Sequence, residues 1–356
     1  MKPVRVGLVG CGKVGQIHAA ALRSLPEAEF VAACDTHPNR AASFGVRAFS
    51  NVATMLRDGG VEAVLIGTPH PLHAEAAVLA AEAGVHVLVE KPMAATLADC
   101  DAMLAAARKS GSTLGVISQR RFFEPVRRMK AAIDAGKIGR PALGVCLMYS
   151  WREPSYYASD PWRGKWDTEG GGVLVNQSPH QLDILLWLMG PAAEVSGYWA
   201  NVNHPTVEVD DTAVATVRFR NGGLGSIVTS VSQKPGIYSK IHIHGTNGAT
   251  LGVETDRGAT FIAGVSTIAE PALNDLWTVS EEEHLLGEFQ AEDRAKFREV
   301  DATVHYHALQ IADFLQAIRE GRPPLVTGDD GRAVVALFSA IYRSDRERRP
   351  IALSAA

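Results

Sequence analysis

The sequence predicts a two-domain α/β protein: a doubly wound parallel sheet comes first, and an α+β domain with an open, mainly antiparallel sheet follows. Three observations support this. A β-branched run at residues 4–9 leads directly into a glycine-rich turn and an alanine-rich helix pattern. Runs typical of buried strands then alternate with helix patterns. After residue 190, apolar and polar residues alternate in long segments. We expect domains at residues 1–121 and 122–356, and whether the C-terminal helices pack back on the first domain stays open.

The glycine-rich turn reads GCGKVG and lies between a strand and a helix pattern, which is the setting that the GxGxxG dinucleotide motif requires. The first glycine permits a tight turn, and the second lets a pyrophosphate approach the backbone. Free N–H groups at the start of the following helix favour phosphate. The turn therefore predicts a Rossmann domain. Its candidate cofactor contacts are Gly10, Gly12, Lys13 and Val14.

A second strand pattern ends in Asp35, 20 residues after Gly15. A carboxylate there can accept hydrogen bonds from both ribose hydroxyls of an adenosine, and it repels a 2′-phosphate. NAD is therefore the favoured cofactor. Arg40 follows five residues later and leaves NADP use open.

Other candidates follow the strand patterns at residues 61–66, 86–89 and 113–117. Ligands of such sheets bind at the carboxyl ends of the strands, where these residues should lie. His73 is equally compatible with a buried structural histidine, and we favour that role. The candidates for cofactor contacts at this edge are Thr68, His70, His73, Glu90, Lys91 and Gln119.

The tripeptide Glu90-Lys91-Pro92 places a lysine at a strand end, where a nicotinamide should lie. Pro92 restricts the local backbone. An ammonium group there can donate to a substrate hydroxyl and favour its alkoxide as hydride leaves. An ordinary surface Glu-Lys pair also fits these three residues.

The segment GGGVLVNQSPHQLD is the second centre of the sequence. Its glycines allow backbone to approach a flat ligand closely. Asn176, His180 and Asp183 then follow at spacings of four and three, which on a helix places them on one face. Pro179 leaves two alternatives: a helix bent at this residue, or a helix that starts there behind a Ser178 cap. His180 alone would be read as a structural core histidine; the glycines and the nucleotide motif favour a functional role.

Together these motifs resemble the Gfo/Idh/MocA oxidoreductases, NAD(P)-dependent enzymes that act mainly on sugars, cyclitols and their derivatives. The resemblance covers nearly the whole chain. It includes GCGKVG, TPHPLH, VEKP, the IGRP turn, WRG ahead of the glycines, and HALQIADFLQAIREGRPPLVTGDDG near the C-terminus.

The resemblance implies that Lys91 and His180 are the catalytic pair. It also implies that Trp162 and Arg163 approach the cofactor, and that NAD contacts Asp35 and Thr68. Many members carry Asp where this chain has Asn176, and Asn cannot share a proton with His180. Members with Asn-Gln at this point include 3-dehydrogenases of pyranose rings, so the resemblance favours such an activity.

Five aromatic residues gather in the irregular segment at residues 151–166. Long aromatic loops in compact domains are commonly functional. Because pyranose rings stack on aromatic faces, this loop is a candidate sugar-binding wall; a hydrophobic lid or an oligomer contact is almost as well supported. The candidate substrate-binding residues are Lys91, Arg121, Tyr157, Asn176, His180 and Asp183.

We therefore expect a dehydrogenase that oxidises a ring secondary hydroxyl of a sugar, glycoside or cyclitol. His180 takes the hydroxyl proton, Lys91 polarises that oxygen, and hydride passes from the carbinol carbon to C4 of NAD. Asp183 is expected to orient His180, and Asn176 to hold a neighbouring hydroxyl. A dihydrodiol dehydrogenase of aromatic degradation is a second interpretation, since these residues suit any ring carbinol. An NAD-binding regulator without turnover is a third.

Composition limits the remaining classes. A net charge of −4 implies no basic face, so nucleic acid is not an expected partner. No apolar run reaches membrane-spanning length, so no membrane partner is expected. The four cysteines lie far apart without metal-ligand spacing, which is typical of buried thiols in a reducing cytoplasm. We predict a cytoplasmic protein without a metal site.

The later part of the chain predicts the open sheet and an oligomer. Apolar residues alternate from Ala213 to Phe219, and Asn221-Gly222-Gly223 is a strong hairpin turn. In the resembled family a free sheet face commonly pairs subunits, so a homodimer or homotetramer is expected. The polar segment at residues 269–298 reads as a solvated excursion, and His305 and His307 as structural residues.

Overall fold

The computed structural model describes residues 2–257, 260–261 and 270–354. The chain forms two compact units. The first comprises Met1–Gln119 and Thr303–Val335, and the second comprises Arg120–Ala302 and Ala336–Ala356. In the C-terminal part the division falls within one long helix, α12 (Gly328–Glu347).

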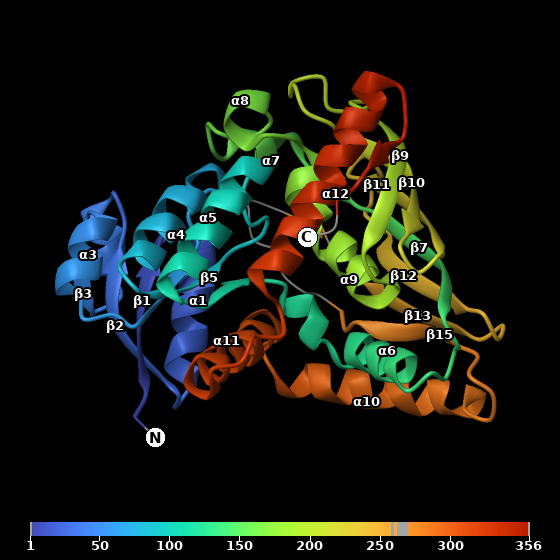
Figure 1. Ribbon diagram of the computed structural model, residues 1–356, viewed down its shortest axis with the longest axis horizontal. Coiled ribbons are helices and arrows are strands. Elements are labelled where there is room, and N and C mark those ends of the chain that lie inside the picture. Colours follow the sequence, from blue (N-terminus) through green and yellow to red (C-terminus); the bar gives the residue numbers. More distant parts are fainter. Residues whose placement is uncertain (1, 258–259, 262–269, 355–356) are drawn as a thin grey trace. The chain divides into compact units, whose positions relative to one another are not determined.

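A six-stranded sheet with the order β3-β2-β1-β4-β5-β6 organises the first unit (Figure 1). Every neighbouring pair is parallel, so the predicted doubly wound parallel sheet is confirmed. The order reverses between β1 and β4, which makes this the switch point where such sheets bind ligands. The strands are β1 (Val4–Val9), β2 (Ala28–Cys34), β3 (Arg47–Phe49), β4 (Ala63–Ile66), β5 (His86–Val89) and β6 (Leu114–Val116).

A side-chain cap defines the start of one helix of the first unit. Thr96 caps α5, because its Oγ1 accepts from Asp99 N at 3.2 Å. Helix α11 supplies Phe314 and Leu315 to the same core as Val6 and Leu8. The helical elements are α1 (Lys13–Ser24), α2 (Pro38–Ala42), α3 (Val52–Asp58), η1 (His70–Leu72), α4 (His73–Glu82), α5 (Leu97–Ser110) and α11 (Ala302–Glu320).

The second unit is built on an eight-stranded sheet with the order β15-β13-β12-β7-β11-β10-β9-β16. Only β7 and β11 pair in parallel, so the predicted open, mainly antiparallel sheet is confirmed. The strands are β7 (Pro141–Tyr149), β9 (Ala192–Ala200), β10 (Thr212–Phe219), β11 (Leu224–Ser230), β12 (Tyr238–Gly245), β13 (Thr250–Thr255), β15 (Leu273–Trp277) and β16 (Ile351–Ala352), with β8 (Trp151–Arg152) and β14 (Thr260–Phe261) in a separate pair.

One face of the second sheet is covered and the other is open. Helix α9 (Pro179–Met189) packs against β7 and β12 (Figure 1). Along β10 the buried residues alternate with exposed ones, as the period of two predicts. The open face carries the exposed side chains of Tyr198, Val214 and Leu224. The remaining helical elements of this unit are η2 (Gln119–Phe122), α6 (Glu124–Asp134), α7 (Pro154–Ala158), α8 (Trp166–Glu169), η3 (Val173–Gln177), η4 (Glu283–Leu285) and α10 (Leu286–Glu299).

Residues 269–298 were expected to form a solvated excursion; residue 269 lies outside the described ranges. The expectation is wrong for β15, whereas in α10 it holds except at the buried Asp293. Strand β15 extends the sheet, and α10 follows it. Asn274 on β15 is fully buried, and its amide donates to Gly252 O at 2.9 Å. Arg128 of α6 pairs with the buried Asp293 of α10 at 3.0 Å. Polar residues that satisfy one another inside the fold made this segment look like a surface loop.

The cysteines and the helix lengths bear on two further predictions. All four cysteines are free thiols and buried, as expected of small hydrophobes. Of the described helices, none combines the length and the apolar composition that crossing a lipid bilayer requires.

Candidate active site

The glycine turn of the first unit has the shape that a phosphate site needs. Gly10 has a φ of +90°, and a Cβ there would lie 2.7 Å from Thr68 N, so only glycine fits. A Cβ at Gly12 would meet nothing within 4 Å. The backbone at Gly12 is thus open to a ligand at the start of α1, whose first residues are Lys13 and Val14.

Asp35 lies beside this turn, directly after β2. Its Oδ2 accepts from Cys11 N and its Oδ1 from His37 N, both at 2.8 Å. These backbone donors hold the carboxylate next to the glycines, as the adenosine role requires. Arg40 lies on α2 and is exposed.

Two buried oxygens at the carboxyl edge of the sheet have no hydrogen-bond partner among the described residues. They are Thr68 Oγ1, after β4, and Gln119 Oε1, after β6. Buried polar atoms are normally paired, so these oxygens suit a ligand with hydrogen-bond donors. Both residues were predicted as cofactor contacts.

His73 is almost fully buried, and its ring joins two loops of this edge. Its Nδ1 lies 3.0 Å from Pro92 O, and its Nε2 lies 2.9 Å from Thr68 O. Burial lowers its pKa against the effect of these carbonyls. The ring thus fixes the loops after β4 and β5, while a direct cofactor contact of His73 stays a prediction. His70 precedes it in η1 and is also buried.

A cluster of buried titratable groups lies behind Lys91. Glu90 Oε1 accepts from His18 Nε2 at 3.0 Å, and Glu90 Oε2 accepts from Lys91 N at 3.1 Å. His307 Nε2 lies 4.0 Å from Glu90 Oε1, and its ring is 5.5 Å from that of His18. His18 was not among the predicted residues, since nothing on α1 distinguishes it from a core position.

The cluster shifts two pKa values. Burial acts to raise the pKa of Glu90, but His18, His307 and Lys91 outweigh it and lower it from 4.5 to about 2. Burial and the neighbouring His18 lower the pKa of His307 from 6.5 to about 4. Glu90 thus stays ionised and His307 neutral near pH 7.

We expect acid to destabilise the protein in two stages that these residues set. Between pH 6.5 and about 4, the unfolded chain binds the His307 proton before the folded one does, so stability falls. Between pH 4.5 and about 2, Glu90 acts in the same direction and contributes on the order of 3 kcal/mol. Urea unfolding at several pH values measures both.

His307→Gln should flatten the upper stage and Glu90→Gln the lower one. Glu29→Gln is the matched control, because Glu29 is exposed on β2 of the same unit. A Glu90→Gln protein whose unfolding free energy kept the wild-type slope below pH 4.5 would contradict this account.

In the second unit, α9 begins at Pro179, which decides between the two alternatives for this segment. Before Ser178, residues Val173–Gln177 form the π-helical turn η3, closed by Ser178 N donating to Val173 O at 2.9 Å. The Ser178 hydroxyl also donates to Val173 O, at 2.8 Å, and does not cap the helix. Asn176 therefore lies on η3 and His180 in the first turn of α9.

Buried Asp210 holds the glycine segment. Its Oδ1 accepts from Gly172 N at 2.7 Å and from the Tyr342 hydroxyl at 2.6 Å, and its Oδ2 accepts from Leu174 N at 3.1 Å. Burial raises the pKa of Asp210 against these donors. Asp210 was not among the predicted residues; the Asp210-Asp211 doublet before β10 was the available signal.

Asn176 is bound to a second buried carboxylate, that of Glu169. Its Nδ2 donates to Glu169 Oε1, and Glu169 Oε2 accepts from Gly164 N at 2.5 Å. Glu169 is 1% exposed, and burial raises its pKa. It was also missed, and its position directly before the three glycines was the only signal.

The structure brings two predicted substrate residues together. Arg121 donates to both oxygens of Asp183, from Nε at 2.7 Å and from Nη2 at 2.6 Å. The side chains are 2% and 5% exposed. Asp183 thus holds Arg121, and its expected action on His180 stays a prediction.

A second pair, missed in the sequence, adjoins this one along the chain. Arg120 Nη2 donates to Asp256 Oδ1 at 2.8 Å, and Gln181 Nε2 donates to Asp256 Oδ2 at 3.1 Å. Residues 120 and 181 flank Arg121 and His180, so Asp256 links the chain on both sides of the predicted residues.

The aromatic segment divides into packing residues and candidates. Trp166 packs edge-on against Trp199, with ring centroids 5.0 Å apart. Arg163 lies over Trp162, 4.4 Å from its ring centroid, and donates to the Tyr156 hydroxyl at 2.5 Å. Tyr157 is buried, and its hydroxyl has no partner among the described residues. Trp162 and Tyr157 therefore stay candidates, whereas Trp166 serves packing.

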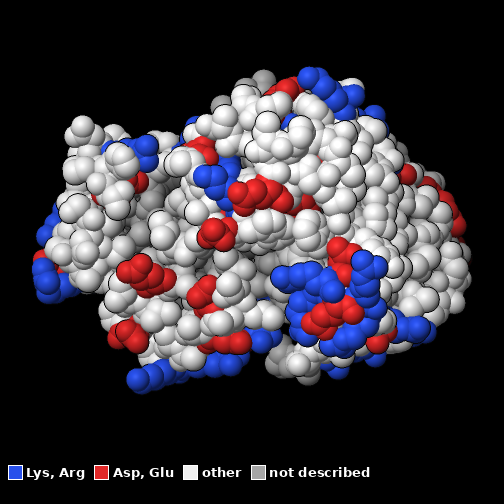
Figure 2. Space-filling view, turned by 90° about the horizontal axis from the view of Figure 1, so that it is seen from above, with Lys and Arg blue, Asp and Glu red and all other residues white. Residues whose placement is uncertain are grey.

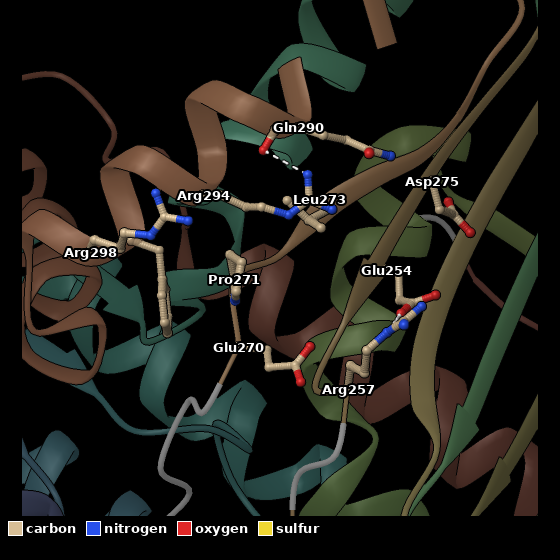
Figure 3. A pocket seen from close by; sticks show the side chains of 10 residues that line it. Glu254, Arg257, Glu270, Pro271, Leu273, Asp275, Gln290, Arg294 and Arg298 are labelled. Atoms are coloured by element: carbon tan, nitrogen blue, oxygen red, sulfur yellow. Dashed lines mark hydrogen bonds and ion pairs between the residues drawn. The ribbon is translucent and has the colours of Figure 1, made fainter. Parts of the chain in front are cut away.

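A pocket of about 420 Å³ lies elsewhere in the second unit, among β13, β15 and α10 (Figure 3). None of the predicted residues lines it. Three basic and three acidic side chains do: Arg257, Arg294, Arg298, Glu254, Glu270 and Asp275. Because basic and acidic side chains are equally numerous in this lining, the pocket shows no preference for an anionic or a cationic ligand.

Charges elsewhere are also mixed. Figure 2 shows one large gathering of Lys and Arg on the face it draws, and Asp and Glu side chains lie within that gathering. Within the described residues, no group of three or more His, Cys, Asp and Glu is arranged to hold a metal ion.

Two family models match this chain over most of its length. The "Oxidoreductase family, NAD-binding Rossmann fold" model of Gfo/Idh/MocA matches residues 4–118, and the "Oxidoreductase family, C-terminal alpha/beta domain" model matches residues 130–353. The chain belongs to the Gfo/Idh/MocA oxidoreductase family. The resemblance inferred from the motifs is confirmed. This Gfo/Idh/MocA protein is an NAD-dependent oxidoreductase, and its first unit contains an NAD(H)-binding Rossmann domain.

Several relatives of this Gfo/Idh/MocA dehydrogenase are known by name. It is 27% identical to the myo-inositol 2-dehydrogenase of Thermotoga maritima, over 98% of both chains. It is 33% identical to the 1-carboxy-3-chloro-3,4-dihydroxycyclohexa-1,5-diene dehydrogenase of Comamonas testosteroni, over 64% of this chain and 58% of that one. The structure of the WlbA dehydrogenase from Bordetella pertussis, in complex with NADH and UDP-GlcNAcA, matches with a TM-score of 0.87 and 31% identity, over 100% of this chain and 99% of that one.

Proposed function

We propose that this dehydrogenase oxidises a secondary hydroxyl on the ring of a sugar, glycoside or cyclitol. The proposal is supported by two relatives that align over almost their whole length. One is named for an inositol as its substrate, and the structure of the other contains a UDP-sugar. The Asn176-Gln177 pair favours pyranose C3 within this class, on the resemblance to pyranose 3-dehydrogenases.

The residues of the first unit fit NAD. The open backbone at Gly12 suits the pyrophosphate, and the Asp35 carboxylate suits the ribose hydroxyls. Thr68 Oγ1 and Gln119 Oε1 can accept hydrogen bonds from the bound cofactor. Bound NAD supplies the acceptor for the hydride of the substrate. We propose that the other cofactor contacts are Gly10, Lys13, Val14, Arg40, His70, His73, Glu90, Lys91, Trp162 and Arg163.

Two residues of the chain act on the substrate oxygen. Lys91 Nζ donates to the hydroxyl oxygen and stabilises the negative charge that develops on it. An imidazole nitrogen of His180 takes the hydroxyl proton as a general base. Asn176 binds a neighbouring hydroxyl, and Arg121, Tyr157 and Asp183 complete the substrate contacts.

A cyclic dihydrodiol is the second candidate substrate. The relative from Comamonas testosteroni carries such a ring in its name, and it shares 33% of the aligned residues. A dihydrodiol presents the same ring carbinol to Lys91 and His180, so the mechanism would be unchanged.

The test is the reduction of NAD and NADP, followed by absorbance, against cyclitols, aldoses, glycosides, nucleotide sugars and dihydrodiols. We expect turnover with NAD and one class of hydroxylated ring. Turnover with dihydrodiols alone would favour the second candidate. If no compound class were turned over although calorimetry confirmed NAD binding, both candidate functions would be contradicted and an NAD-binding regulator would be favoured.

We also propose that the protein is a homodimer or homotetramer that pairs through the open sheet face. Tyr198 on β9 is 71% exposed, and Val214, opposite it on β10, is 46% exposed. Large apolar side chains on an uncovered sheet favour association. Light scattering should give a multiple of 38.1 kDa, and a monomeric mass would contradict the proposal.

A further inference from the structure

We propose that Glu169 is a positioning residue that orients the Asn176 amide, so that position 176 offers a hydrogen-bond acceptor to the substrate. The inference rests on the proposed function, and it adds the polarity of one substrate contact. A ring hydroxyl or acylamino N–H beside the reacting carbinol would then be bound as a donor.

The chemistry of the two partners decides which end of the Asn176 amide faces Glu169. An ionised carboxylate has only acceptor sites, whereas an amide has a donor end and an acceptor end. Glu169 Oε1 accepts from Asn176 Nδ2, so the carboxylate selects the donor end. The acceptor end, Asn176 Oδ1, is therefore turned away from Glu169.

Glu169 is itself held in place. It ends α8 and is 1% exposed, and its other oxygen accepts from Gly164 N at 2.5 Å. One carboxylate thus joins the Asn176 side chain to the backbone of the Trp162-Arg163-Gly164 turn. A carboxylate held by a backbone donor at one end keeps its orientation at the other.

An aspartate at position 176 would be unfavourable beside Glu169. A carboxylate at 176 would face Glu169 at hydrogen-bond distance, and burial already raises the Glu169 pKa. Two buried carboxylates that face each other cannot both ionise at low cost. A neutral amide at 176 avoids this repulsion and still donates to Glu169.

The proposal is tested by reversing the polarity of the pair. In Glu169→Gln, the glutamine carbonyl can still accept from Gly164 N, and its amide N–H groups then face Asn176. The asparagine must flip to accept from them, so it presents Nδ2, a donor, to the substrate. We expect KM for the ring substrate to rise roughly 10- to 100-fold, with KM for NAD unchanged.

Asn176→Asp alone should also impair the enzyme, and its activity should fall further as pH rises, because both carboxylates then ionise. The double variant Glu169→Gln/Asn176→Asp should recover to within roughly tenfold of wild type. In this variant, one oxygen of the new aspartate accepts from the amide of the new glutamine, and the other oxygen stays an acceptor for the substrate. Glu208→Gln is the matched control, since Glu208 accepts from the nearby Trp166 N but is exposed.

Two results would overturn the proposal: wild-type kinetics in Glu169→Gln, or a double variant no better than the worse single one. If the wild type turned over no ring substrate, the proposed function would fail, and urea unfolding would test the Glu169–Asn176 pair instead. The double variant should then lose less unfolding free energy than the sum of the losses in the two single variants. Simple additivity would overturn the pairing itself.

Discussion

Replacing Lys91 by alanine is expected to lower turnover by roughly three orders of magnitude while NAD affinity is largely kept. The variant removes the ammonium group that stabilises the developing alkoxide. It keeps the backbone N–H that donates to Glu90, so the strand end should stay in place. Steady-state kinetics, with the ring substrate that the NAD reduction assay identifies, and calorimetry with NAD measure the two effects.

Two further variants sharpen this test. Lys91→Met keeps the aliphatic length without the charge, so it should match alanine if the ammonium group is what matters. Lys109→Ala removes an exposed lysine of α5 and should leave both readouts unchanged. An equal loss of NAD affinity and turnover in Lys91→Ala would move Lys91 from the chemistry to cofactor binding.

Breaking the buried ion pair between Arg121 and Asp183 should have the largest effect on stability. Arg121→Leu leaves the Asp183 carboxylate buried without its bidentate partner, which costs about 3–5 kcal/mol. The loss also removes the guanidinium from the Trp187 ring, 5.1 Å away. Urea unfolding at pH 7 measures the change.

The double variant Arg121→Leu/Asp183→Leu separates the pair from the packing. Because no charge stays buried in it, it should recover much of the lost free energy. Arg343→Leu is the matched control: Arg343 pairs with Glu347 on the surface of α12 and is 51% exposed, so its loss should be far smaller. A double variant as unstable as the sum of the single ones would show that the pair is not coupled.

Local signals were enough to predict most of the first unit. Turn geometry and strand burial restrict the residue types that are allowed at a position. A few neighbouring residues were therefore enough to interpret the run Val4–Val9, the GCGKVG turn and Asp35. The same holds for the alternation along β10. Hydrophobic periodicity and turn chemistry depend on residues that are neighbours in the chain, so they can be recognised without knowledge of the fold.

The polar interior was not readable in this way. Glu169, Asp210 and His18 look like ordinary surface or core positions in the sequence, yet each is buried. Glu169 and His18 bind the predicted site residues Asn176 and Glu90, and Asp210 binds the backbone of the glycine segment. Strand β15 was missed for the same reason. A buried polar group is stable only when its partner lies nearby, and that partner can be far away along the chain.

The chain sequence alone predicted the Rossmann sheet, favoured NAD as the cofactor and indicated the family. The tertiary structure decided which groups support Lys91 and Asn176: Glu90 accepts from the backbone of one, and Glu169 accepts from the amide of the other. Strand and helix periods depend on local sterics, whereas the partners of a buried carboxylate depend on which distant segments the fold brings into contact.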